Sequence, residues 1–147
     1  MLIYLKKDGK ITYESVNDMP YLEMIIEETQ RVYPATTRID RTCTEDYEYE
    51  GIKIKKGQVW VASIYALHYD EDLYPNPEKF DPDRFSEENK KTRDSSAHMP
   101  FGAGPRNCIA MRFAILEMKI LLVTILTKFK FVKCDQTEVS PPDKIFF

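Results

Sequence analysis

A chain of 147 residues has the length of one ordinary domain, and its 43% hydrophobic and 12% aromatic residues are enough for a modest core. Its 21 Lys and Arg nearly balance its 24 Asp and Glu, giving a net charge of −3, which disfavours a nucleic-acid-binding protein. The composition also argues against disorder, and no segment reaches the roughly 18 apolar residues of a membrane span.

The first predicted helix covers residues 18–33. We expect Asp18 to cap it and Pro20 to lie in its first turn, where a missing N–H costs least. Apolar side chains recur at helical spacing, and Pro34 predicts the end of the helix.

Three further segments follow. Residues 47–64 alternate between apolar and polar side chains and contain Gly51 and Gly57, which predicts short strands. Residues 70–100 are rich in Pro, Asp, Asn and Glu without clear periodicity, which in a compact domain indicates a functional loop. Residues 109–128 carry so many apolar side chains that we expect a long, almost wholly buried helix.

The three cysteines are Cys43, Cys108 and Cys134, so one is unpaired under any disulfide scheme. No Cys-x-x-Cys spacing occurs, which leaves a zinc site or a thioredoxin-type site unsupported. We therefore expect reduced thiols, one of which has a function.

Cys108 follows a loop of glycines and prolines, residues 101–110, that leads directly into the last predicted helix. Near a helix N-terminus, unpaired N–H groups stabilise a thiolate, and Arg106 adds positive charge. Such a thiolate is a good nucleophile or soft metal ligand. A small buried core cysteine is the alternative, and the order of loop, arginine, cysteine and helix argues against it.

Three motifs, in chain order, resemble those of the cytochrome P-450 heme-thiolate monooxygenases. ETQR at 28–31 matches the family's E-x-x-R, and PDRF at 82–85 matches its P-x-R-F. The signature F-x-x-G-x-R-x-C-x-G is matched by Phe101, Gly104, Arg106 and Cys108. The similarity covers roughly residues 15–135 and is greatest to the animal microsomal branch that metabolises drugs and toxins. Ala110 departs from the signature's last glycine, so a methyl group must fit beside the heme face.

This resemblance implies a mainly α-helical fold with small β-sheets (α+β), namely the C-terminal part of the cytochrome P-450 fold, as a single unit over residues 1–147. The family's domain is several times longer, so we expect the chain to be a C-terminal fragment. The family's distal acid–threonine pair has no counterpart in the sequence, and no catalytic side chain is assigned.

The resemblance implies heme b as cofactor and Cys108 as its axial iron ligand. The other cofactor-binding positions would be Phe101, Gly102, Gly104, Arg106, Ala110 and Arg41. Arg106 and Arg41 would pair with heme propionates. Glu28, Arg31 and Arg84 correspond to a buried structural network.

Two further sets of residues receive roles from the resemblance. The substrate pocket would be lined in part by Ala35, Thr36, Thr37, Ile39 and Asp40. His68 and His98 lie outside the family's ligand positions, so we expect hydrogen-bonded structural roles for them.

The implied activity is that of an iron-dependent monooxygenase, which receives electrons from NADPH through a flavoprotein reductase and oxidises an apolar small molecule. It would lie at the cytoplasmic face of the endoplasmic reticulum membrane, with membrane contact only through an N-terminal part absent from this sequence. The chain alone is expected to be inactive. Two alternatives stay open: a heme-thiolate isomerase or dehydratase that needs no reductase, and a non-catalytic fragment that serves as an interaction module.

A basic face is expected to receive the acidic redox partner, with a solvated run of charges as the alternative. Its members would be Lys90, Lys91, Arg93, Arg106 and Arg112.

Overall fold

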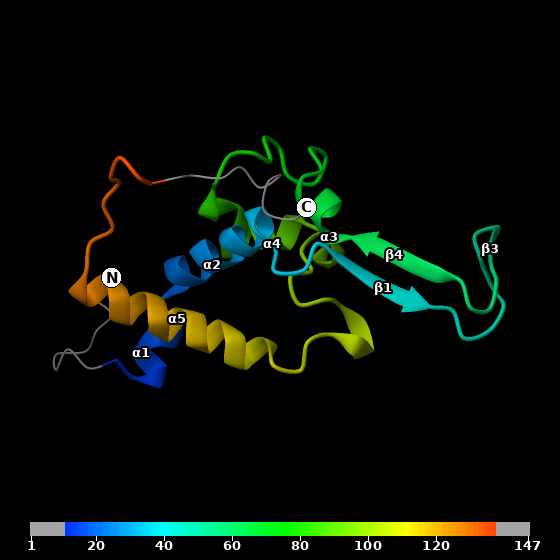
Figure 1. The fold of residues 1–147 in the computed structure, drawn as a ribbon, viewed down its shortest axis with the longest axis horizontal. Helices are drawn as coiled ribbons and strands as arrows, with labels where there is room; N and C mark the ends of the chain where they lie inside the picture. Colours follow the sequence, from blue (N-terminus) through cyan, green and yellow to red (C-terminus); the bar gives the residue numbers. More distant parts are fainter. Residues whose placement is uncertain (1–10, 138–147) are drawn as a thin grey trace.

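The computed structural model describes residues 11–137, which form five α-helices and four short strands (Figure 1). In chain order these are α1 (Tyr13–Asn17), α2 (Pro20–Val32), β1 (Arg38–Thr42), β2 (Tyr47–Tyr49), β3 (Ile52–Ile54), β4 (Val59–Ser63), α3 (Ile64–His68), α4 (Glu87–Thr92) and α5 (Met111–Lys128). Three 3-10 turns, η2 (Pro82–Phe85), η3 (Ser95–Ala97) and η4 (Gly104–Arg106), lie in the long segment before α5. The predicted class, mainly α-helical with small β-sheets, is confirmed.

Helix α2 begins at Pro20, whose fixed φ suits the first helical position. The predicted cap at Asp18 is wrong, because Asp18 is the C-terminal cap residue of the preceding short helix α1. Met19 takes the N-cap position of α2 and makes no side-chain hydrogen bond there. The helix ends at Val32, before Pro34, as predicted.

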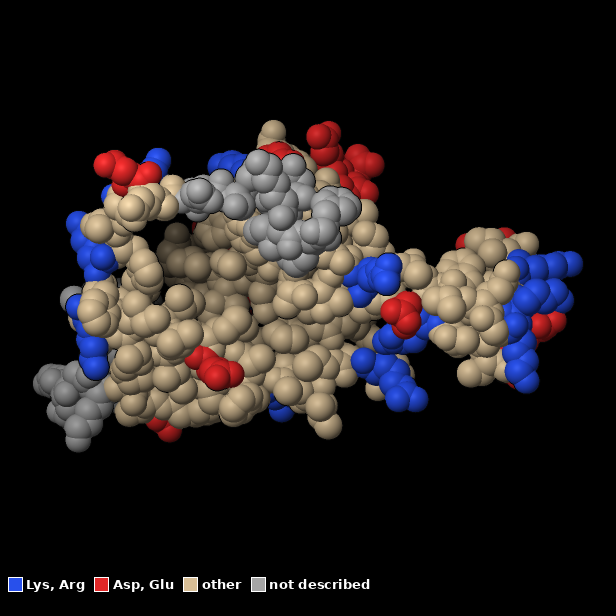
Figure 2. Space-filling view, in the orientation of Figure 1, with Lys and Arg blue, Asp and Glu red and all other residues tan. Residues whose placement is uncertain are grey.

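The four strands make two antiparallel pairs that project from the helical body (Figures 1 and 2). Strand β1 pairs with β4 so that Arg38 lies opposite Ser63, and β2 pairs with β3. Glu50 and Gly51 join β2 to β3, and both have positive φ, as a type I′ hairpin turn requires. The sequence did not predict β1, which has a single apolar side chain.

Helix α2 contributes to both hydrophobic clusters of the described residues. One cluster joins its apolar stripe to α5 and consists of Met19, Leu22, Ile26 and Val123, with Ile11, Met118 and Leu122 packed against it. The other consists of Tyr74, Phe85 and Ala97, with Met24 of α2 and Leu73 packed against it. The helix thus anchors the long loop on one side and α5 on the other.

The prediction that the last helix is almost wholly buried is wrong. Only Lys119 and Val123 of α5 are buried, whereas Phe113 is 68% and Leu121 is 56% exposed. In the described part of the chain, α5 packs mainly against α1 and α2, which together cover one of its faces. None of the described helices combines the length and the apolar character that crossing a bilayer would need.

Candidate functional site

Glu28 and Arg31 form a fully buried ion pair, one turn apart on α2. Arg31 Nε donates to Glu28 Oε2 at 2.8 Å and Arg31 Nη2 donates to Glu28 Oε1 at 2.9 Å, so the pair is bidentate. Both residues are 0% exposed. A buried ion pair is tolerated only when its remaining polar atoms find partners, and here these partners lie in other segments.

Arg31 also binds the loop that follows α3. Its Nη1 donates to the carbonyl oxygen of His68 at 2.8 Å, and its Nη2 donates to that of Pro77 at 2.7 Å. The guanidinium carbon lies 5.6 Å and 5.3 Å from the ring centroids of Tyr69 and Tyr74. One side chain therefore fixes the path of the chain from α3 into the loop.

Glu28 makes the corresponding contacts with η2. Its Oε1 accepts a hydrogen bond from the backbone N–H of Asp81 at 2.8 Å and lies 3.6 Å from Arg84 Nε. Arg84 Nη2 donates to the carbonyl oxygen of Asn76 at 2.9 Å. The structure thus brings together Glu28, Arg31 and Arg84, the three residues that the two shorter motifs singled out.

His68 and His98 stack in the core beside this network, with ring centroids 5.2 Å apart. Burial lowers the pKa of His68 to about 4, and burial together with the charge of a protonated His68 lowers the pKa of His98 to about 3. His68 is hydrogen-bonded, with Nδ1 3.1 Å from the carbonyl oxygen of Arg31, as the sequence predicted. His98 Nε2 is buried without a hydrogen-bond partner among the described residues.

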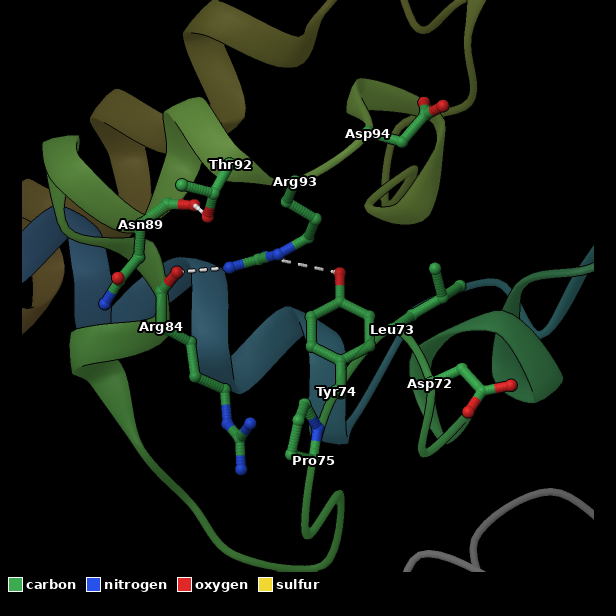
Figure 3. Close-up of a pocket in the computed structure, with 9 residues that line it drawn as sticks. All are labelled: Asp72, Leu73, Tyr74, Pro75, Arg84, Asn89, Thr92, Arg93 and Asp94. Atoms are coloured by element: carbon green, nitrogen blue, oxygen red, sulfur yellow. Dashed lines mark hydrogen bonds between the residues drawn. The ribbon is translucent and has the colours of Figure 1, made fainter.

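Arg93 points into the body of the protein, beside a pocket of about 440 Å³ (Figure 3). It donates hydrogen bonds to the carbonyl oxygen of Arg84 and, at 3.4 Å, to the hydroxyl of Tyr74. Its guanidinium lies 4.7 Å from the ring centroids of both Tyr74 and Phe85. The sequence analysis placed Arg93 on an exposed basic face, because it stands in a run of charged residues, and did not single out Tyr74.

The expected basic face is therefore wrong for two of its five members. Arg93 donates a hydrogen bond to the carbonyl oxygen of Arg84, and Lys90 forms an ion pair with Glu27 at 2.8 Å. Lys91, Arg106 and Arg112 are exposed.

The loop from Phe101 to Ala110 is closed by its own backbone. The Gly102 N–H donates to the carbonyl oxygen of Met99 at 3.0 Å, and the Cys108 N–H donates to that of Phe101 at 2.9 Å. Gly102 and Gly104 have φ of 74° and 72°, a region that favours glycine. Because a Cβ on Gly104 would meet nothing within 4 Å, this glycine is required for its backbone conformation rather than for space.

Cys108 is a free, exposed thiol just before α5, and its carbonyl oxygen accepts a hydrogen bond from the N–H of Met111 at 3.3 Å. Within residues 11–137, its Sγ makes no hydrogen bond and the exposed Arg106 makes no ion pair. Phe101 is half-buried at the start of the loop. The loop thus offers a thiol and a guanidinium to a group outside this part of the chain.

These residues fit an iron porphyrin. In the described residues, no three His, Cys, Asp or Glu side chains are grouped as a metal site would need. A single thiolate suffices when a porphyrin supplies the other iron ligands, and an unpaired arginine suits a propionate. Ala110, in the position of the signature's last glycine, has an ordinary φ of −89°, so its methyl group introduces no backbone strain.

The other predicted binding residues lie on or near β1. Arg41 is exposed, and its Nη1 donates to the carbonyl oxygen of Asp40 at 2.7 Å. Within residues 11–137, its side chain makes no hydrogen bond to the cysteine loop. Ile39 is half-buried and faces the opposite side of the strand from the exposed Asp40. Of the loop before β1, Ala35 and Thr36 are exposed and Thr37 is half-buried.

Comparisons with known proteins agree with the motifs. The family model described as Cytochrome P450 matches residues 3–146. The chain is 43% identical over 137 residues to Cytochrome P450 3A31 of Mesocricetus auratus, covering 93% of this chain and 27% of that protein. It is 45% and 47% identical over 128 residues to Cytochrome P450 3A29 of Sus scrofa and 3A16 of Mus musculus, each time covering 87% of this chain and 25% of the relative. The chain thus spans about a quarter of the length of these relatives, and it belongs to the cytochrome P450 family.

Proposed function

We propose that the chain supplies the heme-thiolate part of a cytochrome P450 monooxygenase, with Cys108 as the axial ligand of heme b. The observation that carries this proposal is the free, exposed Cys108 thiol at the end of a loop closed by its own hydrogen bonds. When bound, heme supplies the oxygen chemistry, which a thiolate ligand favours by donating electron density to the iron.

The other loop residues orient the cofactor in this proposal. The ring of Phe101 packs on the thiolate side of the heme, and Arg106 and Arg41 pair with its propionates. Gly102 and Gly104 shape the loop so that the sulfur projects from it, and Ala110 lies beside the heme face.

The network of Glu28, Arg31 and Arg84 has a structural role. It joins α2 to the loop that leads to Cys108, so that the ligand is held relative to the helical core. No catalytic side chain is assigned among these three residues.

The family relationship supports the proposal for the substrate and partners. We propose an apolar small-molecule substrate, with Ala35, Thr36, Thr37, Ile39 and Asp40 forming part of the pocket wall. The electrons come from NADPH through a flavoprotein reductase, which approaches the exposed Lys91, Arg106 and Arg112. The protein acts at the cytoplasmic face of the endoplasmic reticulum membrane.

A non-catalytic interaction module is the second candidate. The exposed apolar side chains of α5, including Phe113 and Leu121, favour it, because exposed apolar patches mark surfaces that bind other proteins. An interaction module of this kind needs no heme, so heme ligation separates the two candidates. An isomerase or dehydratase would also use the thiolate and differs in needing no reductase.

Alkylation of the thiols tests the proposal. Cys108 and Cys134 are both exposed, so iodoacetamide reaches both in the free chain. Hemin should slow the alkylation of Cys108 and leave that of Cys134 unchanged, as measured by mass spectrometry of the digested chain. Equal rates at Cys108 with and without hemin would contradict heme ligation.

A further inference from the structure

His68 connects the buried ion pair on α2 to the beginning of the cysteine loop. It is the last residue of α3 and is 0% exposed. Its Nδ1 lies 3.1 Å from the carbonyl oxygen of Arg31, and its Nε2 accepts a hydrogen bond from the N–H of Met99 at 3.4 Å. The imidazole therefore touches both segments through different atoms.

The two partners fix the protonation of the ring. The carbonyl oxygen of Arg31 can only accept, so Nδ1 of His68 must carry a proton. The N–H of Met99 can only donate, so Nε2 must be unprotonated. The neutral Nδ1–H tautomer satisfies both bonds, and the lowered pKa of His68, due first to burial, keeps the ring neutral.

Backbone hydrogen bonds connect Met99 to the turn that contains Cys108. Its carbonyl oxygen accepts a hydrogen bond from the N–H of Gly102 at 3.0 Å. The carbonyl oxygen of Phe101 then accepts one from the N–H of Cys108 at 2.9 Å. A displacement of Met99 thus disturbs the turn that holds Cys108 in place.

We propose that His68 is a positioning residue, which fixes the cysteine loop to the buried Glu28–Arg31 pair through its two ring nitrogens. This goes beyond the proposed function, because it concerns the conformation of the loop in the chain itself and holds whether or not heme binds. The competing explanation is that the ring only fills space beside His98.

Two amide substitutions at His68 test its two hydrogen bonds separately, because each keeps one bond and removes the other. In His68→Gln the amide group reaches as far from Cγ as Nε2 does and can accept from Met99, whereas in His68→Asn it reaches only as far as Nδ1 and can donate to Arg31. His98→Asn is the matched control, because it removes the stacked ring and leaves both bonds of His68 intact.

Hydrogen exchange of backbone amides is the readout. We expect exchange at Met99 and Gly102 to be about fivefold faster in His68→Asn, since a typical net hydrogen bond is worth about 1 kcal/mol. His68→Gln keeps the acceptor for Met99 but loses the bond to Arg31, so its exchange should be accelerated less than that of His68→Asn. His98→Asn should exchange at the rate of the unsubstituted chain. Equal acceleration in His68→Asn and His68→Gln, acceleration in His98→Asn alone, or no change in any variant would overturn the proposal.

A measurement on the unsubstituted chain keeps the proposal testable if a variant does not fold. The 15N chemical shifts of the His68 ring at neutral pH should identify a protonated Nδ1 and an unprotonated Nε2. A protonated Nε2 would overturn the proposal, because it cannot accept a hydrogen bond from Met99.

Discussion

The guanidinium of Arg93 donates a hydrogen bond to the backbone carbonyl oxygen of Arg84. Arg93 directly follows α4, and Arg84 belongs to η2 and lies 3.6 Å from the buried Glu28. The hydrogen bond therefore connects the end of α4 to η2. The guanidinium carbon of Arg93 also lies 4.7 Å from the ring centroids of both Tyr74 and Phe85, so it extends the network of Glu28, Arg31 and Arg84 into the second hydrophobic cluster.

Replacing Arg93 should destabilise the chain although a charged run surrounds it. Arg93→Met removes two hydrogen bonds and two cation–π contacts, and we expect a loss of about 2 kcal/mol in the free energy of unfolding. The exposed Lys91, two residues earlier, is the matched control, and Lys91→Met should change stability by less than about 0.5 kcal/mol. Urea unfolding followed by circular dichroism measures both, and equal effects would contradict the interior position of Arg93.

Breaking the buried ion pair between Glu28 and Arg31 should lower the free energy of unfolding by more than Arg93→Met does. Glu28→Ala leaves the guanidinium of Arg31 buried without its counter-charge, which typically costs 3–5 kcal/mol, on the order of the whole stability of a small domain. Arg84→Ala should cost less, because its Nε lies 3.6 Å from Glu28 and its side chain is partly exposed. As a control, Asp46→Asn breaks an exposed pair with Lys55 and should change stability far less than Glu28→Ala does. Thermal unfolding ranks the three variants, and a Glu28→Ala chain as stable as Asp46→Asn would contradict the network's role.

Stability should fall as the pH is lowered from about 6.5 towards 4. His68 and His98 have pKa values of about 4 and about 3 in the folded chain, below the ordinary value of 6.5. Between these values the unfolded chain binds protons that the folded chain does not, so each histidine lowers stability by up to about 1.4 kcal/mol per pH unit. Glu27 acts in the opposite direction, since burial raises its pKa.

Urea unfolding at pH 7 and pH 5.5 measures this pH dependence. His98→Gln should reduce the slope by removing one of the two titrating groups. A slope that His98→Gln leaves unchanged would show that this histidine is not held neutral in the folded chain.

We expect the 147-residue chain, supplied with hemin, reductase and NADPH, to form no oxidised product. The cysteine loop would cover only the thiolate face of a bound heme, and productive oxygen chemistry requires that water also be excluded from the opposite face, to which Ala35, Thr36, Thr37, Ile39 and Asp40 would contribute only part of a pocket wall. Mass spectrometry of an apolar substrate after incubation checks this, with an intact microsomal monooxygenase as positive control. Substrate oxidation in proportion to NADPH consumed would contradict the expectation.

The sequence predicted the contacts that depend on local spacing. Glu28 and Arg31 are three residues apart, so they share one face of any helix that contains them. The position of Cys108 in a glycine-containing loop just before the helix likewise follows from a short stretch of chain.

Three features could not be predicted from the sequence, because each depends on contacts with residues far away along the chain. Strand β1 forms because Arg38–Thr42 pairs with β4, and its own side chains give little indication of a strand. The apolar composition of α5 indicated burial, but burial also requires neighbours to cover the helix, and the described residues cover one face. Arg93 was placed on an exposed basic face for the same reason, because the aromatic rings that it contacts come from two other segments.

The spectrum of the ferrous–CO complex tests the central claim most directly. Thiolate ligation moves the Soret band of that complex to a longer wavelength, so the chain reconstituted with hemin should show the red-shifted band. Cys134→Ser, which removes the other exposed thiol near the end of the described chain, should keep the band, and Cys108→Ser should lose it. A red-shifted band that persists in Cys108→Ser would contradict the assignment of Cys108 as the heme ligand.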